Sequence, residues 1–428
     1  MTQKTILILT VGGSPKPLLV SIHQNRPDFV WFVCSDDGPK VKGSYVEVIG
    51  EGLVCKSAMN APQPDMPNIP SQLAMPPASF DHIRIASFDN LNDCYLKSLE
   101  LIERVHREHP AARVITDYTG GTKSMTAGLA AAALDDGRCD IKIVTGIRQD
   151  LRAVTDRTES VRPVQVWDSQ VRRSLRRVDD MLSRFDYAGA VRLLEDTSRR
   201  FASDTTSETI QAWLIACRAF EAWDRFDHAT ARALLQPDKP QWKNCLTFLA
   251  MLIDQRGHGW ELVEDLLMNA QRRVVQQRYD DAVGRLYRAL ELTAQIWLEK
   301  RHGIVTGNVE LERIPENFRA EIASRGRSDG AIKIGLVDAW SVAAAFEGDP
   351  LGAAFSTAKP KLLSFLNTRN ASLFAHGCRP VSESDYVTHG RFVESFVSDA
   401  ITAAIAELKL PRRATLQQFP VRIDLPHD

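Results

Sequence analysis

The chain lacks the features that mark a disulfide-bonded, zinc-binding or membrane-spanning protein. It has seven cysteines, at positions 34, 55, 94, 139, 217, 245 and 378, an odd number with no CxxC pair. This pattern favours reduced thiols in a cytoplasmic protein, and it argues against a zinc site. We therefore expect no metal at the functional sites. No apolar run approaches the roughly 20 residues needed to cross a membrane, and the apolar N-terminal run leads into Gly12-Gly13 without a small-residue cleavage site. We expect neither a membrane span nor a signal peptide.

An excess of charge of one sign is also missing. The 53 Lys and Arg residues are balanced by 54 Asp and Glu residues. A nucleic-acid partner would therefore need a local basic cleft, because no basic field surrounds the whole protein. A chain of 428 residues is too long for one small core, so two or three domains are expected.

The first 168 residues have the pattern of a doubly wound, Rossmann-like α/β domain. Continuous apolar runs, which suit strands buried on both faces of a parallel sheet, occur at Lys4–Val11, Phe29–Cys34, Ile83–Phe88, Arg113–Asp117 and Asp140–Val144. Helical periodicity between them is clearest over 91–108 and 123–135. Residues 52–80 include six prolines between Pro62 and Pro77 and are expected to form an irregular surface insertion.

The rest of the chain is expected to be all α-helical. From Ser169 to about Leu410 no strand alternation stands out. A helical linker region is predicted over 169–259, and a last helical domain over 260–428.

A glycine-rich loop is predicted where the fourth strand passes into a helix. Gly120-Gly121-Thr122-Lys123 allows a tight turn and places backbone N–H groups, hydroxyls and one cation at a helix N-terminus. This arrangement favours a phosphate, although it matches neither a Walker A loop nor a dinucleotide fingerprint. The alternative without a ligand is a tight strand–helix turn with an ordinary Thr or Ser N-cap.

A second loop of the same kind favours the ligand-binding alternative. The first strand ends at Gly12-Gly13-Ser14, followed by Lys16 and another helix. If the first and fourth strands are neighbours, both loops flank the crevice where such sheets bind nucleotides. Two such loops predict a ligand with more than one phosphate.

A third group of residues lies near the C-terminus. Arg369, Asn370 and His376 are spaced so that, in one continuous helix capped by Gly377, Arg369 and His376 would project from the same face. Histidine moves protons near neutral pH and arginine is a permanent cation, so the pair suits metal-free RNA cleavage. The alternative is a histidine at a helix end and a solvated arginine.

Together, the Gly-Gly-Ser-Pro start, the Asp-Tyr-Thr-Gly-Gly-Thr-Lys loop, the helical linker and the Arg-Asn…His segment resemble the CRISPR-associated CARF–HEPN ribonucleases of type III systems. The resemblance covers nearly the whole chain in the same order, including a long helix over Ala282–Lys300. It implies a CARF domain over 1–168 that senses a cyclic oligoadenylate, and a HEPN domain over 260–428 that cuts single-stranded RNA without a metal. It also implies a homodimer with no cofactor, whose allosteric activator is a ring of four or six adenylates.

The resemblance also implies the site residues. The catalytic residues would be Arg369, Asn370 and His376. The cyclic oligoadenylate would be bound by Thr10, Gly12, Gly13, Ser14, Thr119, Gly120, Gly121, Thr122 and Lys123.

Two alternatives stay open. The chain could be a nucleotide-sensing regulatory module whose helical domain is catalytically inactive and binds a partner. A metal site at His106 and His109, which share a helix face before Pro110, is not expected because the sequence shows no third ligand nearby. A solvated histidine pair is expected there.

Overall fold

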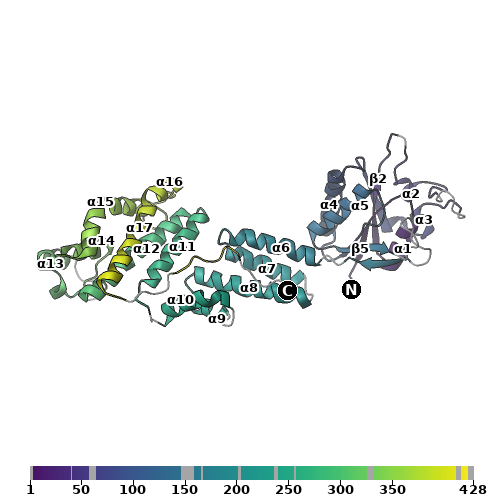
Figure 1. Ribbon diagram of the computed structural model, residues 1–428. Coiled ribbons are helices and arrows are strands. Elements are labelled where there is room, and N and C mark those ends of the chain that lie inside the picture. Colours follow the sequence, from purple (N-terminus) through teal and green to yellow (C-terminus); the bar gives the residue numbers. More distant parts are fainter. Residues whose placement is uncertain are drawn as a thin grey trace. The chain divides into compact units, whose positions relative to one another are not determined.

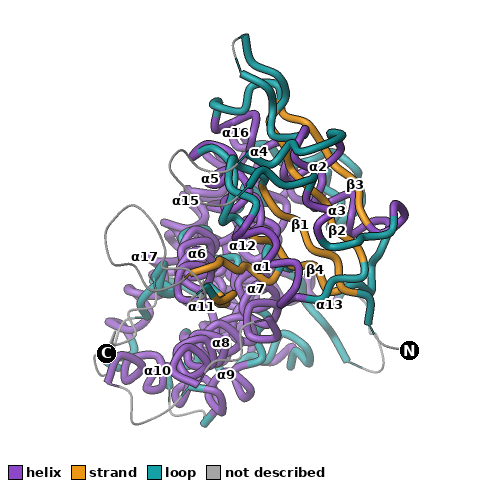
Figure 2. Tube along the Cα trace, turned by 90° about the vertical axis from the view of Figure 1, so that its right-hand side faces the viewer, coloured by secondary structure: helices purple, strands orange, loops and turns teal. Residues whose placement is uncertain are grey.

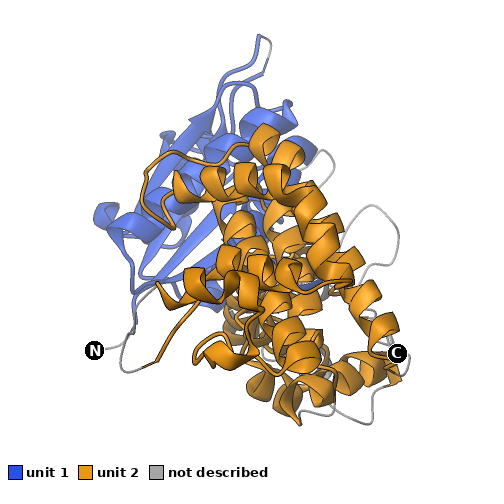
Figure 3. Ribbon diagram, turned by 90° about the vertical axis from the view of Figure 1, so that its left-hand side faces the viewer, with its two compact units in different colours: residues 1–172 blue, residues 173–428 orange. Residues whose placement is uncertain are grey.

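The computed structural model describes residues 3–39, 41–56, 64–145, 159–164, 167–200, 204–235, 240–254, 257–324, 331–410 and 416–422. The chain divides into two compact units, residues 1–172 and 173–428 (Figure 3). The further division of the helical part at residue 260 stays a prediction. Among the described residues, no helix is both long and apolar enough to cross a membrane.

The first unit contains a six-stranded sheet with the order β3-β2-β1-β4-β5-β6 (Figures 1 and 2). The neighbours from β3 to β5 are parallel, and β6 is antiparallel to β5. The strands are β1 Thr5–Thr10, β2 Phe29–Ser35, β3 Phe80–Ile85, β4 Arg113–Asp117, β5 Asp140–Thr145 and β6 Ser160–Pro163. The helices of this unit are α1 Lys16–Asn25, α2 Val46–Ile49, α3 Ile69–Gln72, η1 Pro77–Ser79, α4 Leu91–Glu108 and α5 Lys123–Asp136.

Both faces of this sheet are covered, which explains the continuous apolar strands. In β1, Ile6 and Ile8 belong to a core that includes Leu129 of α5. Leu7 and Leu9 point the other way, into a core that includes Leu18 of α1. Alternate residues of one strand therefore enter two different cores, so no polar position is left between them.

The predicted doubly wound α/β architecture is confirmed, with differences in detail. The third strand, β3, begins three residues before the predicted run Ile83–Phe88, and β6 was not predicted. Part of the predicted insertion forms short helices, α3 and η1, and Cys55 pairs with Met66 in an isolated β-bridge. Residues 57–63 of this insertion lie outside the described residues.

Within its described residues, the second unit is helical, as predicted. Its first helices are α6 Trp167–Leu182, which begins at the end of the first unit, α7 Tyr187–Arg200, α8 Asp204–Asp224, α9 His228–Leu234, η2 Pro240–Trp242 and α10 Lys243–Ile253. The remaining helices are α11 Glu261–Val275, α12 Tyr279–Trp297, η3 Leu298–His302, η4 Leu311–Arg313, α13 Glu316–Ala323, α14 Leu336–Ala345, α15 Pro350–Asn370, α16 Glu383–Asp385, η5 Tyr386–Gly390 and α17 Arg391–Glu407.

One apolar core joins the helices from α11 onward. It includes the fully buried residues Trp260, Trp297 and Trp340, and it continues through Phe365 of α15 to Val397 of α17. This core packs α15 against α12 and so fixes the position of the C-terminal end of α15.

Candidate ligand and catalytic sites

The two glycine-rich loops of the first unit lie against each other. They follow β1 and β4, which are adjacent parallel strands paired from Thr5↔Arg113 to Leu9↔Asp117. A Cβ on Gly12 would come within 2.5 Å of the Gly121 nitrogen, and a Cβ on Gly120 within 2.4 Å of the Thr10 carbonyl oxygen. Only glycine allows this approach at Gly12 and Gly120, so the loops form one continuous surface at the switch point of the sheet.

Buried Asp117 organises the start of the second loop. Its carboxylate accepts hydrogen bonds from the Ser21 hydroxyl at 2.5 Å and from the Thr119 backbone N–H at 2.9 Å. The Thr119 hydroxyl also donates to this carboxylate, and it accepts the Val144 N–H at 2.8 Å. Thr119 therefore connects β4 with β5, and its hydroxyl is already engaged within the protein.

The hydroxyls of Thr10 and Thr122 also make contacts within the fold. Thr10, fully buried, donates to the Gly120 carbonyl. Thr122 caps α5 by accepting the Met125 N–H at 3.3 Å, and it donates to the Phe88 carbonyl at 2.7 Å. These hydrogen bonds connect the two loops to each other and to the residues before α4, so both hydroxyls are already engaged within the protein.

A cavity of about 570 Å³ lies beside the loops. It is lined by Val11, Gly12, Gly13, Ser35, Val41, Lys42, Gly43, Ser44, Val46, Glu47, Leu53, Val54, Lys56, Gly121 and Thr122. Four of the predicted ligand residues, Gly12, Gly13, Gly121 and Thr122, are thus brought together there. The other five, Thr10, Ser14, Thr119, Gly120 and Lys123, do not line it. Lys123 is exposed at the first position of α5.

Three charged residues that line the cavity were not identified from the sequence. Lys42 and Lys56 are largely exposed, and their ammonium groups lie 3.8 Å from Asp37 and 2.8 Å from Asp65. Lys42-Gly43-Ser44 follows β2, whose carboxyl end reaches the same edge of the sheet. In the sequence, a lysine followed by Gly-Ser after a predicted strand could have indicated this third segment of the cavity lining.

Glu47 is the third charged residue of this lining. Burial raises the pKa of its carboxyl group to about 7. One of its carboxyl oxygens is buried and has no hydrogen-bond partner among the described residues. The cavity therefore combines two cations with a carboxyl group that gains or loses its proton near neutral pH.

The catalytic candidates do not share one helix, which corrects the expectation drawn from their spacing. Helix α15 ends at Asn370, so Arg369 is in its last turn and His376 lies beyond it. Ser372 is buried, and its hydroxyl donates to the Arg369 carbonyl at 2.7 Å. A serine that satisfies a helix-end carbonyl in this way competes with continuation of the helix. Gly377 is consequently not the helix cap.

Instead, residues 371–377 fold back on the end of α15. The His376 N–H donates to the Asn370 carbonyl at 3.2 Å, and the Gly377 N–H donates to the Ser372 carbonyl at 3.3 Å. A Cβ on Gly377 would lie 2.1 Å from the Ala371 oxygen, so the loop can close only on glycine at this position. The loop brings the backbone of His376 next to the end of α15.

Arg369 is held by an aromatic ring and by its neighbour. Its guanidinium carbon lies 4.2 Å from the ring centroid of Tyr287 in α12. One of its terminal nitrogens donates to the Asn370 side-chain oxygen at 3.1 Å. Its Nε is buried and has no hydrogen-bond partner among the described residues. The guanidinium is thus held between Tyr287 and Asn370, and a planar, permanently charged group of this kind suits a phosphate.

The surface around this loop is partly apolar. Asn370 and His376 are exposed, and between them Leu373 and Phe374 are 70% and 53% exposed. Two exposed large apolar side chains next to three polar groups mark a surface that another molecule can cover.

The fold resembles that of a solved structure. "Enterococcus italicus Csm6 bound to cyclic hexa-2'-fluoro-hexa-dAMP" matches with a TM-score of 0.58 and 11% identity, over 94% of this chain and 94% of that chain. At this identity the match shows a shared fold. A comparison with curated proteins gives no significant match.

A family model matches part of the second unit. Residues 255–399 match the model described as "Csm6 HEPN domain". Over this segment the chain is similar to a HEPN domain. Arg369, Asn370 and His376 lie inside the matched segment, and the glycine-rich loops lie outside it, in the α/β unit.

Proposed function

We propose that this chain is a metal-independent endoribonuclease that cuts single-stranded RNA when a cyclic oligoadenylate binds its CARF domain, as part of type III CRISPR antiviral defence in the cytoplasm. The observation that carries the proposal is the loop after α15. It returns His376 to Asn370, beside an arginine held on Tyr287, within a segment that matches a HEPN family model.

These groups can perform cleavage by the RNA's own hydroxyl. The ribose 2′-oxygen attacks the adjacent phosphorus and loses its proton to a base, while the bond from phosphorus to the 5′-oxygen breaks and that oxygen gains a proton. His376 acts as general acid or base, and Arg369 stabilises the negative charge that develops on the phosphoryl oxygens. Asn370 orients Arg369 through their side-chain hydrogen bond. The products carry a 2′,3′-cyclic phosphate, or the 3′-phosphate formed by its hydrolysis.

The cavity of the CARF domain supports the choice of activator. Backbone groups of Gly12, Gly13 and Gly121, together with Lys42 and Lys56, line it. Backbone N–H groups at a tight turn and lysine ammonium groups both favour phosphates. The related fold is described as a complex with a cyclic hexanucleotide analogue, which agrees with a ring of several phosphodiesters.

A homodimer is part of the proposal. Leu373 and Phe374 are exposed in the loop of residues 371–377. The same loop of a second copy of the chain would cover them. A cyclic activator with repeated units also suits a two-fold axis, since each subunit can offer it identical loops. Light scattering should give the mass of two chains, and a stable monomer with and without activator would remove this part of the model.

One cleavage experiment tests the central proposal. Purified protein is incubated with labelled single-stranded RNA in EDTA, alone, with cyclic tetra-adenylate or with cyclic hexa-adenylate. Cleavage that depends on one of the rings, with 2′,3′-cyclic phosphate ends, is the expected result. Binding of a ring without cleavage would instead favour the alternative, a nucleotide-sensing regulator with an inactive helical domain.

A further inference from the structure

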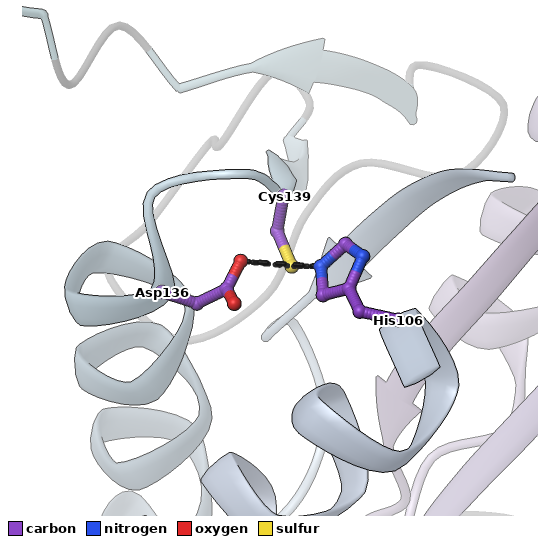
Figure 4. Close-up of side chains that lie close together, drawn as sticks. All are labelled: His106, Asp136 and Cys139. Carbon is purple, nitrogen blue, oxygen red and sulfur yellow. Dashed lines mark hydrogen bonds and ion pairs between the residues drawn. The ribbon is translucent and has the colours of Figure 1, made fainter. Parts of the chain in front are cut away.

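His106, Asp136 and Cys139 converge in the α/β unit (Figure 4). They come from the last turn of α4, the last residue of α5 and the turn before β5. The side chain of His106 is 9% exposed and that of Asp136 is 2% exposed. The expectation that His106 is one of a solvated histidine pair is therefore wrong.

The three potential donor atoms are spaced like the ligands of a tetrahedral metal site. The His106 Nε2 lies 3.2 Å from the Asp136 Oδ2, and the Cys139 Sγ lies 3.6 Å from that oxygen and 3.8 Å from that nitrogen. With metal–ligand bonds of about 2.0 Å to oxygen and nitrogen and about 2.3 Å to sulfur, tetrahedral angles give separations of roughly 3.3 Å for N–O and roughly 3.5 Å for pairs with sulfur. The observed triangle needs only small movements to hold an ion.

The backbone explains why these residues meet. Gly137 ends α5 in the left-handed conformation, at φ 67°, and this turn carries Cys139 back towards Asp136. Helices α4 and α5 pack against each other and both end near this point. Two helix C-termini carry partial negative charge, which favours a cation between them.

Arg138 is a cation that also binds Asp136, and it could compete with a metal ion for this carboxylate. Its guanidinium contacts Oδ1, whereas Oδ2 is the oxygen that faces His106 and Cys139. Its guanidinium donates to the Asp136 Oδ1 at 2.5 and 3.1 Å, and its backbone N–H donates to Oδ2 at 2.9 Å. These bonds fix the carboxylate with Oδ2 directed towards His106 and Cys139. Outer hydrogen bonds of this kind orient metal-ligating carboxylates in other proteins.

We propose that His106, Asp136 and Cys139 form a structural site for one divalent transition-metal ion, with zinc the best match to a nitrogen, oxygen and sulfur donor set. On binding, the Cys139 thiol releases its proton to solvent and the sulfur bonds to the metal. A water molecule or another small ligand completes the coordination. The ion would tie the ends of α4 and α5 to the start of β5.

The site is separate from the activator cavity. Helix α5 has 14 residues, so its last residue, Asp136, lies roughly 20 Å along the helix axis from the loop at its first residue. Metal binding here is independent of the proposed ribonuclease activity. A test of metal binding therefore neither supports nor contradicts the proposed ribonuclease activity.

Metal content and cobalt spectroscopy test the proposal. Full-length protein is supplied with Zn²⁺, dialysed and analysed for bound metal, and a second sample is loaded with Co²⁺. About one ion per chain is expected, with a thiolate-to-cobalt absorption band in the visible to near-ultraviolet range. His106→Ala, Asp136→Asn and Cys139→Ser should each lose the ion, and Cys139→Ser should lose the band.

Two matched variants separate this site from others. His109→Ala removes the neighbouring histidine, and Cys378→Ser removes the exposed cysteine of the HEPN domain; both should keep the ion and the band. EDTA should lower the thermal unfolding midpoint of the wild type and of His109→Ala by several degrees, and leave that of Cys139→Ser unchanged. Wild-type protein that binds neither Zn²⁺ nor Co²⁺, or a cobalt band that persists in Cys139→Ser, would overturn the proposal even if other variants fold poorly.

Discussion

The backbone N–H of His376 donates a hydrogen bond to the carbonyl of Asn370, 3.2 Å away, immediately after α15 ends. Seven residues of continuous helix would have separated Arg369 and His376 by roughly 10 Å along the axis. In the structure, residues 371–377 fold back, so the backbone of His376 lies next to that of Asn370 instead. The backbone N–H of His376 therefore lies against the end of the helix that carries Arg369.

Arg369→Ala and His376→Ala should each lower RNA cleavage at saturating activator by about 10²–10⁴-fold, because each removes charge stabilisation or proton transfer. Activator affinity should change little, since the glycine-rich loops lie in the other unit. Single-turnover cleavage and calorimetric binding provide the two measurements. Arg379→Ala, which removes a nearby exposed arginine paired with Asp385, is the matched control and should stay close to wild type. A His376→Ala enzyme with more than a tenth of wild-type activity would exclude that residue as the proton carrier.

Mixed dimers distinguish a one-chain catalytic group from a group shared across the two-fold axis. If one chain supplies both Arg369 and His376, a dimer of one Arg369→Ala chain and one His376→Ala chain contains no complete pair and should stay inactive. If each cleft takes arginine from one subunit and histidine from the other, half of the clefts regain a pair and activity partly returns. Subunit exchange is verified by differently tagged chains before cleavage is measured.

Gly377→Ala should impair cleavage although it alters no proposed catalytic group. The added methyl would lie 2.1 Å from the Ala371 oxygen, so the loop has to open and His376 moves away from Asn370. A displacement of about 1 Å in a catalytic group costs on the order of 10²-fold in rate. Gly307→Ala is the control, because a methyl there meets nothing within 4 Å. Equal rates for the two variants would show that cleavage does not depend on the closed loop.

Lys123→Ala should shift activation by the cyclic ligand to concentrations about one to two decades higher. Lys123 does not line the cavity, but it directly follows Thr122, which does, and its side chain is exposed. A charge-assisted hydrogen bond from this ammonium to a phosphate of the ring would contribute roughly 1.5–3 kcal/mol. The dose–response curve of RNA cleavage measures this shift. Lys97→Ala, which removes an exposed lysine of α4 paired with Glu100, should leave the curve in place. Superimposable curves for wild type and Lys123→Ala would mean that Lys123 does not contact the activator.

Glu47 should make activator binding depend on pH. Its pKa in the folded protein is raised to about 7, so the carboxyl group in the cavity is largely neutral at pH 6 and largely charged at pH 8. The charged form repels phosphodiesters, and affinity should fall by up to about tenfold between these values. Glu47→Gln should flatten this dependence, whereas an unchanged pH profile in the variant would assign the effect to another group.

The same residue has a predictable effect on stability. The raised pKa means that the folded state holds this proton more tightly than the unfolded state does. The free energy of unfolding should therefore decrease as pH rises from the ordinary carboxyl pKa near 4.5 to about 7. Thermal midpoints should then be higher for Glu47→Gln than for wild type at pH 8, with a smaller difference at pH 5.

Local sequence patterns were sufficient for the architecture of the first unit and for its two loops. Strand β1 is apolar from Ile6 to Leu9 because its two faces enter two cores, and that property is visible in the sequence. The helices after Thr122 and Asn90 begin at residues whose side chains cap them, as their residue types favour. Gly12 and Gly120 follow strands, so a close approach of the loops could be expected once β1 and β4 were taken as neighbours.

Only the tertiary structure decided where α15 ends and which side chains meet. The residues after Asn370 include good helix formers, but burial of Ser372 and its bond to Arg369 stop the helix. Helical periodicity predicts which side chains share a face of one helix. It does not predict which residues of other segments those side chains contact. His106 meets Asp136 and Cys139, and Arg369 meets Tyr287, because packing of whole helices brings residues distant in the chain within a few ångströms.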